Sequence, residues 1–160
     1  MIPQRILAVL SLAAASVSAI DLRFFNQNNC GRNYWVACNN ANPGFCCHTA
    51  DEDYTVSAGL FAIPTQWSIV CQWWDQTGCS SGPLKATTLN YQRDYVCLGA
   101  PVGGQRGWVH GLSYYFNGRK REVKARDDPA EGCQRANILH LDDGSEYDLA
   151  DLSNATYSEV

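Results

Sequence analysis

Eight cysteines constrain the fold of this 160-residue chain more than any other feature of its sequence. An even number of cysteines in a short exported chain is typical of a disulfide framework, so we predict four disulfides. The pairing stays open, because eight cysteines can be joined in about a hundred ways. The cysteines are Cys30, Cys38, Cys46, Cys47, Cys71, Cys79, Cys97 and Cys133.

The spacing of the cysteines disfavours a zinc site. No two of them are separated by two residues, and the adjacent Cys46 and Cys47 are poorly placed to ligate one tetrahedral ion. With every thiol paired, a cysteine nucleophile is not expected either. We therefore assign a structural role to the sulfur atoms and predict no metal and no cofactor.

The first 19 residues have the three parts of a cleavable secretory signal peptide. Arg5 supplies a positive charge, an uncharged stretch follows over residues 6–17, and small residues end at Ala19. The apolar stretch is shorter than the roughly 20 residues that a membrane-spanning helix needs. We therefore predict cleavage after Ala19 and a secreted, extracellular protein with no membrane span.

The formal net charge of −4 at neutral pH limits the kinds of partner. Nucleic acids and anionic membranes attract basic protein faces, so an acidic chain is poorly suited to either. We expect the partner to be an extracellular protein or a glycan, and the protein itself to be a monomer.

Short β-prone runs broken by Asn, Gly and Pro predict an all-β or β-dominated fold. We predict strands over residues 21–25, 54–63, 67–74 and 89–98. Asn117-Gly118 and Asp143-Gly144 predict β-hairpins over 112–123 and 137–149, because both pairs accept the positive φ of a tight turn. We expect one domain over 20–98, and a hairpin extension with a polar tail over 99–160 packed on the same domain.

Two stretches resemble the Greek-key motifs of the βγ-crystallin superfamily. The first runs from Leu22 to Tyr34, where an aromatic run leads to Gly31, and the second runs from Trp67 to Cys79. A Val-Ser pair at 56–57 is similar to the serine-bearing strand of that family. The resemblance, over about residues 21–79, implies a disulfide-stapled Greek-key β-sandwich with added C-terminal hairpins.

The calcium motif of that family is only partly matched, at residues 52–57. Glu52 and Val56 depart from its pattern of two acidic or amide residues, two arbitrary residues and two hydroxyl residues. Calcium needs several converging oxygen ligands, so the loss of one ligand-bearing residue disfavours calcium binding. We expect a solvated acidic loop here.

The chain also resembles the small secreted cysteine-rich proteins of filamentous fungi. The residues that carry this resemblance are Cys38, the Asn-Pro pair at 42–43, the adjacent Cys46 and Cys47, and the stretch from Cys133 to Leu149. The resemblance implies an effector-like protein that acts on other cells outside the producing one.

Tryptophan is abundant, with five residues, and its placement on one predicted strand suggests a binding surface. Alternation along 67–74 places Trp73 on the core-facing side. Trp74 then falls beside Gln72 on the opposite face, unless a bulge changes the register. We expect Trp74 and Gln72, together with Trp35 and Trp108, to contact a protein or glycan. The alternative is that these rings build the core.

No catalytic motif of high specificity is present, since the chain has neither a Gly-x-Ser-x-Gly elbow nor a His-Glu-x-x-His pair. A secreted binding or effector-like protein is therefore the leading prediction. One alternative is a small secreted hydrolase whose acid and base come from His48 or from an acidic group on the second hairpin. That group is Asp142, Asp143 and Glu146. Another alternative is a structural or antimicrobial βγ-crystallin-like protein.

Two short motifs predict modification. Asn154 begins an Asn-Ala-Thr sequon, so we expect a glycoprotein. Lys120-Arg121 lies in a basic run on a predicted hairpin arm, where proteolytic processing is an alternative to a plain solvated surface.

Overall fold

The structure is a computed structural model that describes residues 20–31, 33–49, 55–79, 84–99, 109–118 and 133–152. These residues form eleven β-strands and one 3-10 helix, η1 (Asn28–Cys30), which confirms the predicted all-β class. The predicted signal peptide, residues 1–19, lies outside the described residues. No helix within the described ranges has the length and hydropathy needed to cross a membrane.

Two sheets make up the fold. Sheet A has the strand order β11-β10-β2-β1-β4-β7, and each of its neighbouring pairs is antiparallel. Its strands are β1 (Ile20–Phe25), β2 (Tyr34–Ala41), β4 (Ser57–Phe61), β7 (Val96–Leu98), β10 (Ile138–Leu141) and β11 (Glu146–Asp148).

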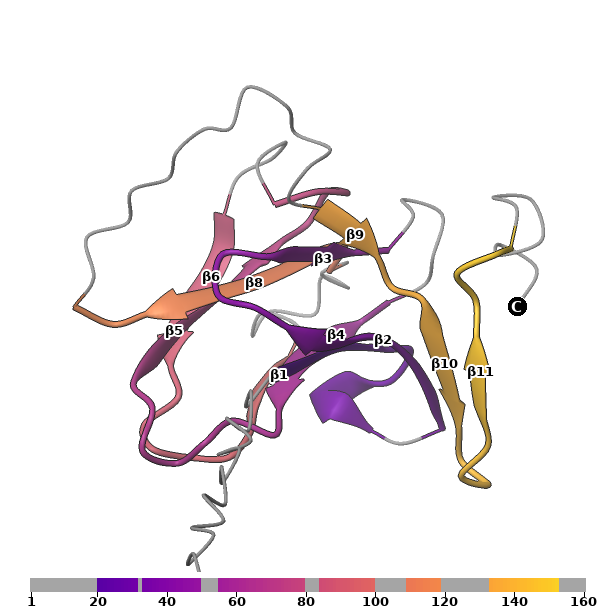
Figure 1. The fold of residues 1–160 in the computed structure, drawn as a ribbon, viewed down its shortest axis with the longest axis horizontal. Helices are drawn as coiled ribbons and strands as arrows, with labels where there is room; N and C mark the ends of the chain where they lie inside the picture. Colours follow the sequence, from indigo (N-terminus) through magenta and orange to yellow (C-terminus); the bar gives the residue numbers. More distant parts are fainter. Residues whose placement is uncertain are drawn as a thin grey trace, which may run out of the picture.

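Sheet B has the order β6-β5-β8-β3-β9. Its strands are β3 (Cys46–His48), β5 (Ile69–Trp74), β6 (Leu84–Leu89), β8 (Gly111–Phe116) and β9 (Cys133–Arg135). Its pairs are antiparallel except for β3 and β9, which run parallel at one edge. The chain passes repeatedly between the sheets, so each sheet holds strands from early and late parts of the chain (Figure 1).

The core lies between the two sheets, where alternate residues of facing strands meet. Leu22 and Phe24 of β1 contribute from sheet A, and Ile69 and Trp73 of β5 contribute from sheet B. Tyr114 of β8 is fully buried and donates its phenol hydrogen to the backbone carbonyl of Ala41, 2.8 Å away. The predicted core-facing side of the 67–74 strand is therefore confirmed. The sandwich-like class is also supported, but the Greek-key connection is not confirmed.

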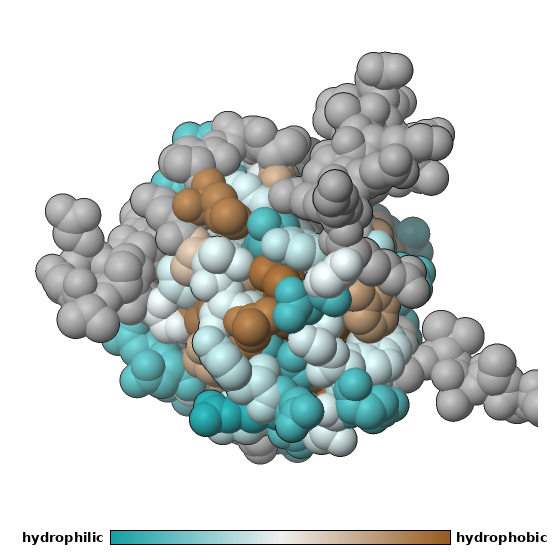
Figure 2. Space-filling model, turned by 90° about the vertical axis from the view of Figure 1, so that its left-hand side faces the viewer, coloured by the Kyte–Doolittle hydropathy of each residue, from teal (hydrophilic) through white to brown (hydrophobic). Residues whose placement is uncertain are grey.

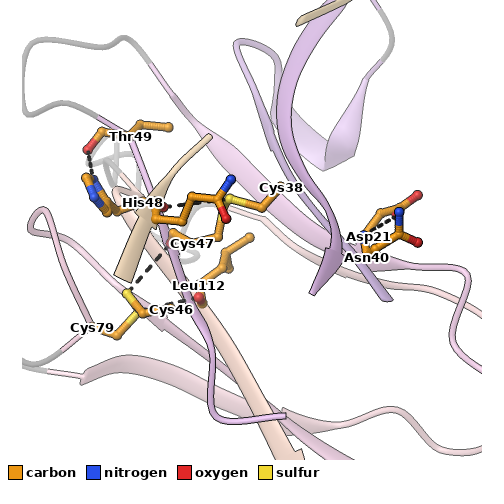
Figure 3. Close-up of a disulfide and its surroundings, with 10 residues drawn as sticks. Asp21, Cys38, Asn40, Cys46, Cys47, His48, Thr49, Cys79 and Leu112 are labelled. Carbon is orange, nitrogen blue, oxygen red and sulfur yellow. Dashed lines mark hydrogen bonds between the residues drawn. A yellow bond between two sulfur atoms is a disulfide. The ribbon is translucent and has the colours of Figure 1, made fainter. Parts of the chain in front are cut away.

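Three disulfides are formed, rather than the four predicted. They join Cys30 to Cys97, Cys38 to Cys47 and Cys46 to Cys79. The adjacent Cys46 and Cys47 bond different partners because successive strand residues point to opposite faces (Figure 3).

Cys71 and Cys133 keep free thiols. Cys71 lies on β5 and Cys133 on β9, and two strands of sheet B separate them. With neighbouring strands about 4.8 Å apart, their Cα atoms are roughly 14 Å apart. That is about twice the Cα separation that a disulfide can span. A fourth bridge between these two cysteines is therefore incompatible with the fold.

Some of the predicted turns and strands are confirmed, and one predicted strand is not. The hairpin over 137–149 is present as β10 and β11, with Gly144 at φ 87°. The first arm and turn of the other hairpin are present as β8 and an Asn117-Gly118 turn, with Gly118 at φ 85°. Its second arm lies outside the described residues. The single strand predicted over 89–98 is wrong, because β6 ends at Leu89 and a turn precedes β7.

Candidate binding surface

The predicted exposure of Trp74 and Gln72 is wrong, because both side chains are 4% exposed. A register shift falls between Trp73 and Trp74 in the pairing of β5 with β6. The chain after β5 folds back, so that the backbone around Gln76 approaches Gly111 beside Trp74. Both faces of this strand end are therefore covered.

Trp35 is half-buried on the outer face of sheet A, in a row of stacked side chains that we call the ring row. Its ring stacks on His140 at 4.9 Å between centroids. On its other side, the Arg23 guanidinium lies 5.5 Å from the Trp35 centroid and 4.6 Å from that of Phe61. Phe61 in turn stacks on Tyr95 at 6.0 Å. The ring row therefore crosses sheet A from β10 to the start of β7.

Strand alternation explains why these residues share one face. Arg23 alternates with the core residues Leu22 and Phe24, so its side chain points away from the core. Trp35 lies opposite His140 across β2 and β10, and both therefore point to the same side. An ion pair between Arg23 and Asp21, with nitrogen and oxygen 2.9 Å apart, helps to orient the guanidinium.

The turn between β6 and β7 adjoins one end of the ring row; we call residues 90–95 the Tyr91 turn. Tyr91 and Gln92 have φ of 49° and 58°, and the Arg93 amide donates to the Asn90 carbonyl at 2.9 Å. Two consecutive positive φ values define a type I′ turn, which strongly favours Asn and Gly. Large side chains here cost free energy, on the order of 1–2 kcal/mol per residue.

Asn90 holds this strained turn in place. Its side chain is 1% exposed, and its carbonyl oxygen accepts a hydrogen bond from the Ile69 amide at 3.0 Å. Its side-chain nitrogen donates to the backbone carbonyls of Trp67, at 2.9 Å, and Arg93, at 3.3 Å. The far end of the turn is fixed by the Ile63 amide, which donates to the Asp94 carbonyl at 2.9 Å.

Two tyrosines project from the Tyr91 turn. Tyr91 is 71% exposed and Tyr95 is 51% exposed, and Gln92 and Arg93 are exposed between them. Figure 2 shows that apolar residues on the face it presents gather in small separate groups among pale and hydrophilic ones. The described residues visible on that face therefore form no broad apolar patch of the kind that marks a large hydrophobic interface.

The residues of the predicted hydrolase are divided between the two sheets. His48 lies on β3 of sheet B, with its Nδ1 3.3 Å from the Thr49 carbonyl oxygen. Asp142 and Asp143 form the exposed turn between β10 and β11, on sheet A. A carboxylate oxygen of Glu146 lies 3.5 Å from Nδ1 of His140 on β10, also on sheet A. The hydrolase stays a prediction.

Several other predicted sites lie outside the described residues: Trp108, the Asn154 sequon, the Lys120-Arg121 pair, and Glu52 of the calcium-like motif. Among the residues that the structure does describe, no group of three or more His, Cys, Asp or Glu side chains could hold a metal ion.

Sequence reasoning missed the Tyr91 turn because the usual turn signals are absent. The run Asn-Tyr-Gln-Arg-Asp-Tyr over 90–95 has neither Gly nor Pro. Its most informative residue is Asn90, whose side chain can replace backbone hydrogen-bonding partners.

One family model matches the chain, over residues 21–137, and it describes an N-terminal domain. The match ends just before β10, so that β10 and β11 of sheet A lie beyond it. No curated protein and no solved structure matches the chain. Nothing in these comparisons supports the resemblance to βγ-crystallins.

Proposed function

We propose that this chain, which belongs to the ARB_05566_N family, is an extracellular binding protein that recognises a protein partner through the Tyr91 turn. The ring row meets that turn where Phe61 stacks on Tyr95, and it extends the recognition surface across sheet A.

The observation that carries the proposal is the unfavourable conformation of Tyr91 and Gln92. An exposed I′ turn is more stable with Asn and Gly, so folding alone does not favour two large residues with φ of 49° and 58°. Strained residues that the surrounding structure holds firmly are concentrated at binding and catalytic sites. Because Asn90 fixes the turn, little conformational entropy would be lost when a partner binds.

A protein partner fits the surface better than a glycan. Tyrosine and arginine are enriched at the centres of protein–protein interfaces, and Tyr91, Arg93 and Tyr95 are all exposed in this one turn. The rings of Trp35 and Phe61 have neighbours stacked against their faces, so the row mainly presents ring edges to a ligand.

The disulfides support the proposed location. Three disulfides are typical of an oxidising compartment outside the cytosol. Together with the predicted signal peptide, they support a secreted protein. An effector-like role, as in the small cysteine-rich proteins of filamentous fungi, is the form of binding function that we propose.

The proposal predicts that one double substitution raises stability and weakens partner binding. Tyr91→Asn with Gln92→Gly supplies the residue types that a I′ turn favours, so we expect a higher melting temperature. The same change removes the exposed ring, so we expect binding at least about tenfold weaker. The measurements are thermal unfolding, and titration of immobilised wild-type and variant proteins against the strongest partner from an extracellular-protein array.

Tyr147→Ala is the matched control. Tyr147 is 52% exposed on β11, outside the Tyr91 turn, so its loss should leave both melting temperature and binding unchanged. Partner binding as tight in the double variant as in the wild type would contradict the proposal. Selective binding on a parallel glycan array, lost in the double variant, would reassign the surface to glycans.

A further inference from the structure

Cys133 lies directly opposite a cysteine that is already in a disulfide. It pairs with Cys46 in the parallel register of β9 and β3, and Cys46 is bonded to Cys79. Residues paired in this way have Cα atoms about 4.8 Å apart and side chains on the same face of the sheet. That separation is within the range of about 4.4–6.8 Å found in disulfides.

The three residues also differ in accessibility in a way that suits exchange. Cys133 is half-exposed on the edge strand of sheet B, and Cys79 is half-exposed at the end of the segment that follows β5. Cys46 is 4% exposed; it is bonded to Cys79 and lies opposite Cys133. A thiol at the sheet edge therefore adjoins a buried half-cystine whose disulfide partner, Cys79, is half-exposed.

We propose that Cys133, Cys46 and Cys79 form a thiol–disulfide exchange site. The Cys133 thiolate attacks Sγ of Cys46, the Cys46–Cys79 bond breaks, and a Cys46–Cys133 bond forms. Cys79 leaves as a thiolate and takes up the proton that Cys133 gave up. One disulfide is lost and one is gained, so the step needs no oxidant or reductant.

The exchange changes which parts of the chain are tied together. The Cys46–Cys79 bond fastens the segment after β5 to β3, whereas a Cys46–Cys133 bond would fasten β9 to β3. The exchanged form therefore releases the segment that folds back beside Trp74 and presents Cys79 as the reactive thiol.

Cys71 provides an internal control, because its thiol is fully buried on β5. Burial raises the pKa of Cys71 from 9.0 to about 12, so this thiol stays protonated and unreactive near neutral pH. Any labelling of the native chain should therefore report on the exchange site.

The test is native alkylation of the oxidised full chain with N-ethylmaleimide at pH 8, followed by acidic digestion and disulfide mapping by mass spectrometry. We expect two species: one labelled at Cys133 with the Cys46–Cys79 bond, and one labelled at Cys79 with a Cys46–Cys133 bond. Cys133→Ser should eliminate labelling of Cys79, whereas Cys71→Ser should leave both species in place. Labelling of Cys133 alone, with every Cys46–Cys79 bond intact, would overturn the proposal.

Cys79→Ser gives an independent test, because it leaves Cys46 without its present partner. We expect the secreted variant to contain a Cys46–Cys133 disulfide. Recovery of this variant with both thiols free would also overturn the proposal. Neither experiment depends on a binding partner, so its failure would leave the proposed role of the Tyr91 turn unaffected.

Discussion

At the scale of single residues, Trp74 shows how one irregularity reverses a prediction. Regular alternation places Trp73 and Trp74 on opposite faces, and only one face of a half-exposed strand is buried. Here a register shift occurs at this pair, and the following segment folds back over the strand end. The sequence of β5 contains no signal for either event, because both depend on chain segments that are distant in sequence.

The burial of Trp74 predicts a large loss of stability on truncation. Trp74→Ala should lower the free energy of unfolding by about 3–5 kcal/mol, comparable to Trp73→Ala, because both rings are 4% exposed. Urea unfolding of the oxidised proteins measures the effect. A Trp74 variant as stable as the wild type would mean that this ring is exposed after all.

Tyr114 predicts the behaviour of the protein at alkaline pH. Burial raises its pKa from 10.0 to about 12, so the phenol ionises more readily in the unfolded chain. The stabilisation from this residue is therefore complete below pH 10 and is lost as the pH rises towards 12. The difference in phenolate absorbance between wild type and Tyr114→Phe should have its midpoint near pH 12. A midpoint near 10 would contradict the burial.

At the scale of elements, local turn chemistry separates what could be predicted from what could not. The β10–β11 turn follows from Asp143-Gly144: the glycine has the positive φ, and Asp143 Oδ1 accepts the Ser145 amide at 2.8 Å. Hydrogen bonds from Ser145 also lower the pKa of Asp143. The Tyr91 turn has no such local signal, because contacts from Asn90 to β5 and its preceding residues stabilise it.

The position of Gly59 on β4 predicts that adding even one carbon atom, as a Cβ, reduces the stability of the fold. A Cβ on Gly59 would lie 2.8 Å from the Val96 carbonyl oxygen and 2.8 Å from the Phe61 ring. The carbonyl belongs to the neighbouring strand β7 and cannot move without breaking the β4–β7 pairing. Gly59→Ala should therefore reduce stability by about 1–3 kcal/mol in urea unfolding. Gly144→Ala, where the turn is open, tests backbone strain without crowding.

At the scale of the whole molecule, the count of cysteines alone overstated the number of disulfides. The count predicts four bridges, but strand order keeps Cys71 and Cys133 apart, and strand order was not available from the sequence. The β-rich class, by contrast, follows from short β-prone runs such as those of β1 and β5, which local residue patterning identifies.

The thiol count of the purified protein tests this arrangement. The intact mass of the oxidised chain should be lower by six hydrogens than that of the fully reduced chain, because three disulfides are formed. A thiol reagent should detect one group in the native protein and two after denaturation, since only Cys71 is buried. A mass lower by eight hydrogens would instead require four bridges and a different strand order.

The position of strand β8 also determines when, during synthesis, the Cys46–Cys79 disulfide should form. It fills the slot between β5 and β3, and the Cys46–Cys79 bridge passes over it, with Sγ of Cys79 3.3 Å from the Leu112 carbonyl oxygen (Figure 3). Both cysteines leave the ribosome before β8 does. Early oxidation would therefore form the bridge before β8 lies between β5 and β3. An isomerase that reopens such a premature bond until residues 111–116 have emerged would raise the yield of native protein.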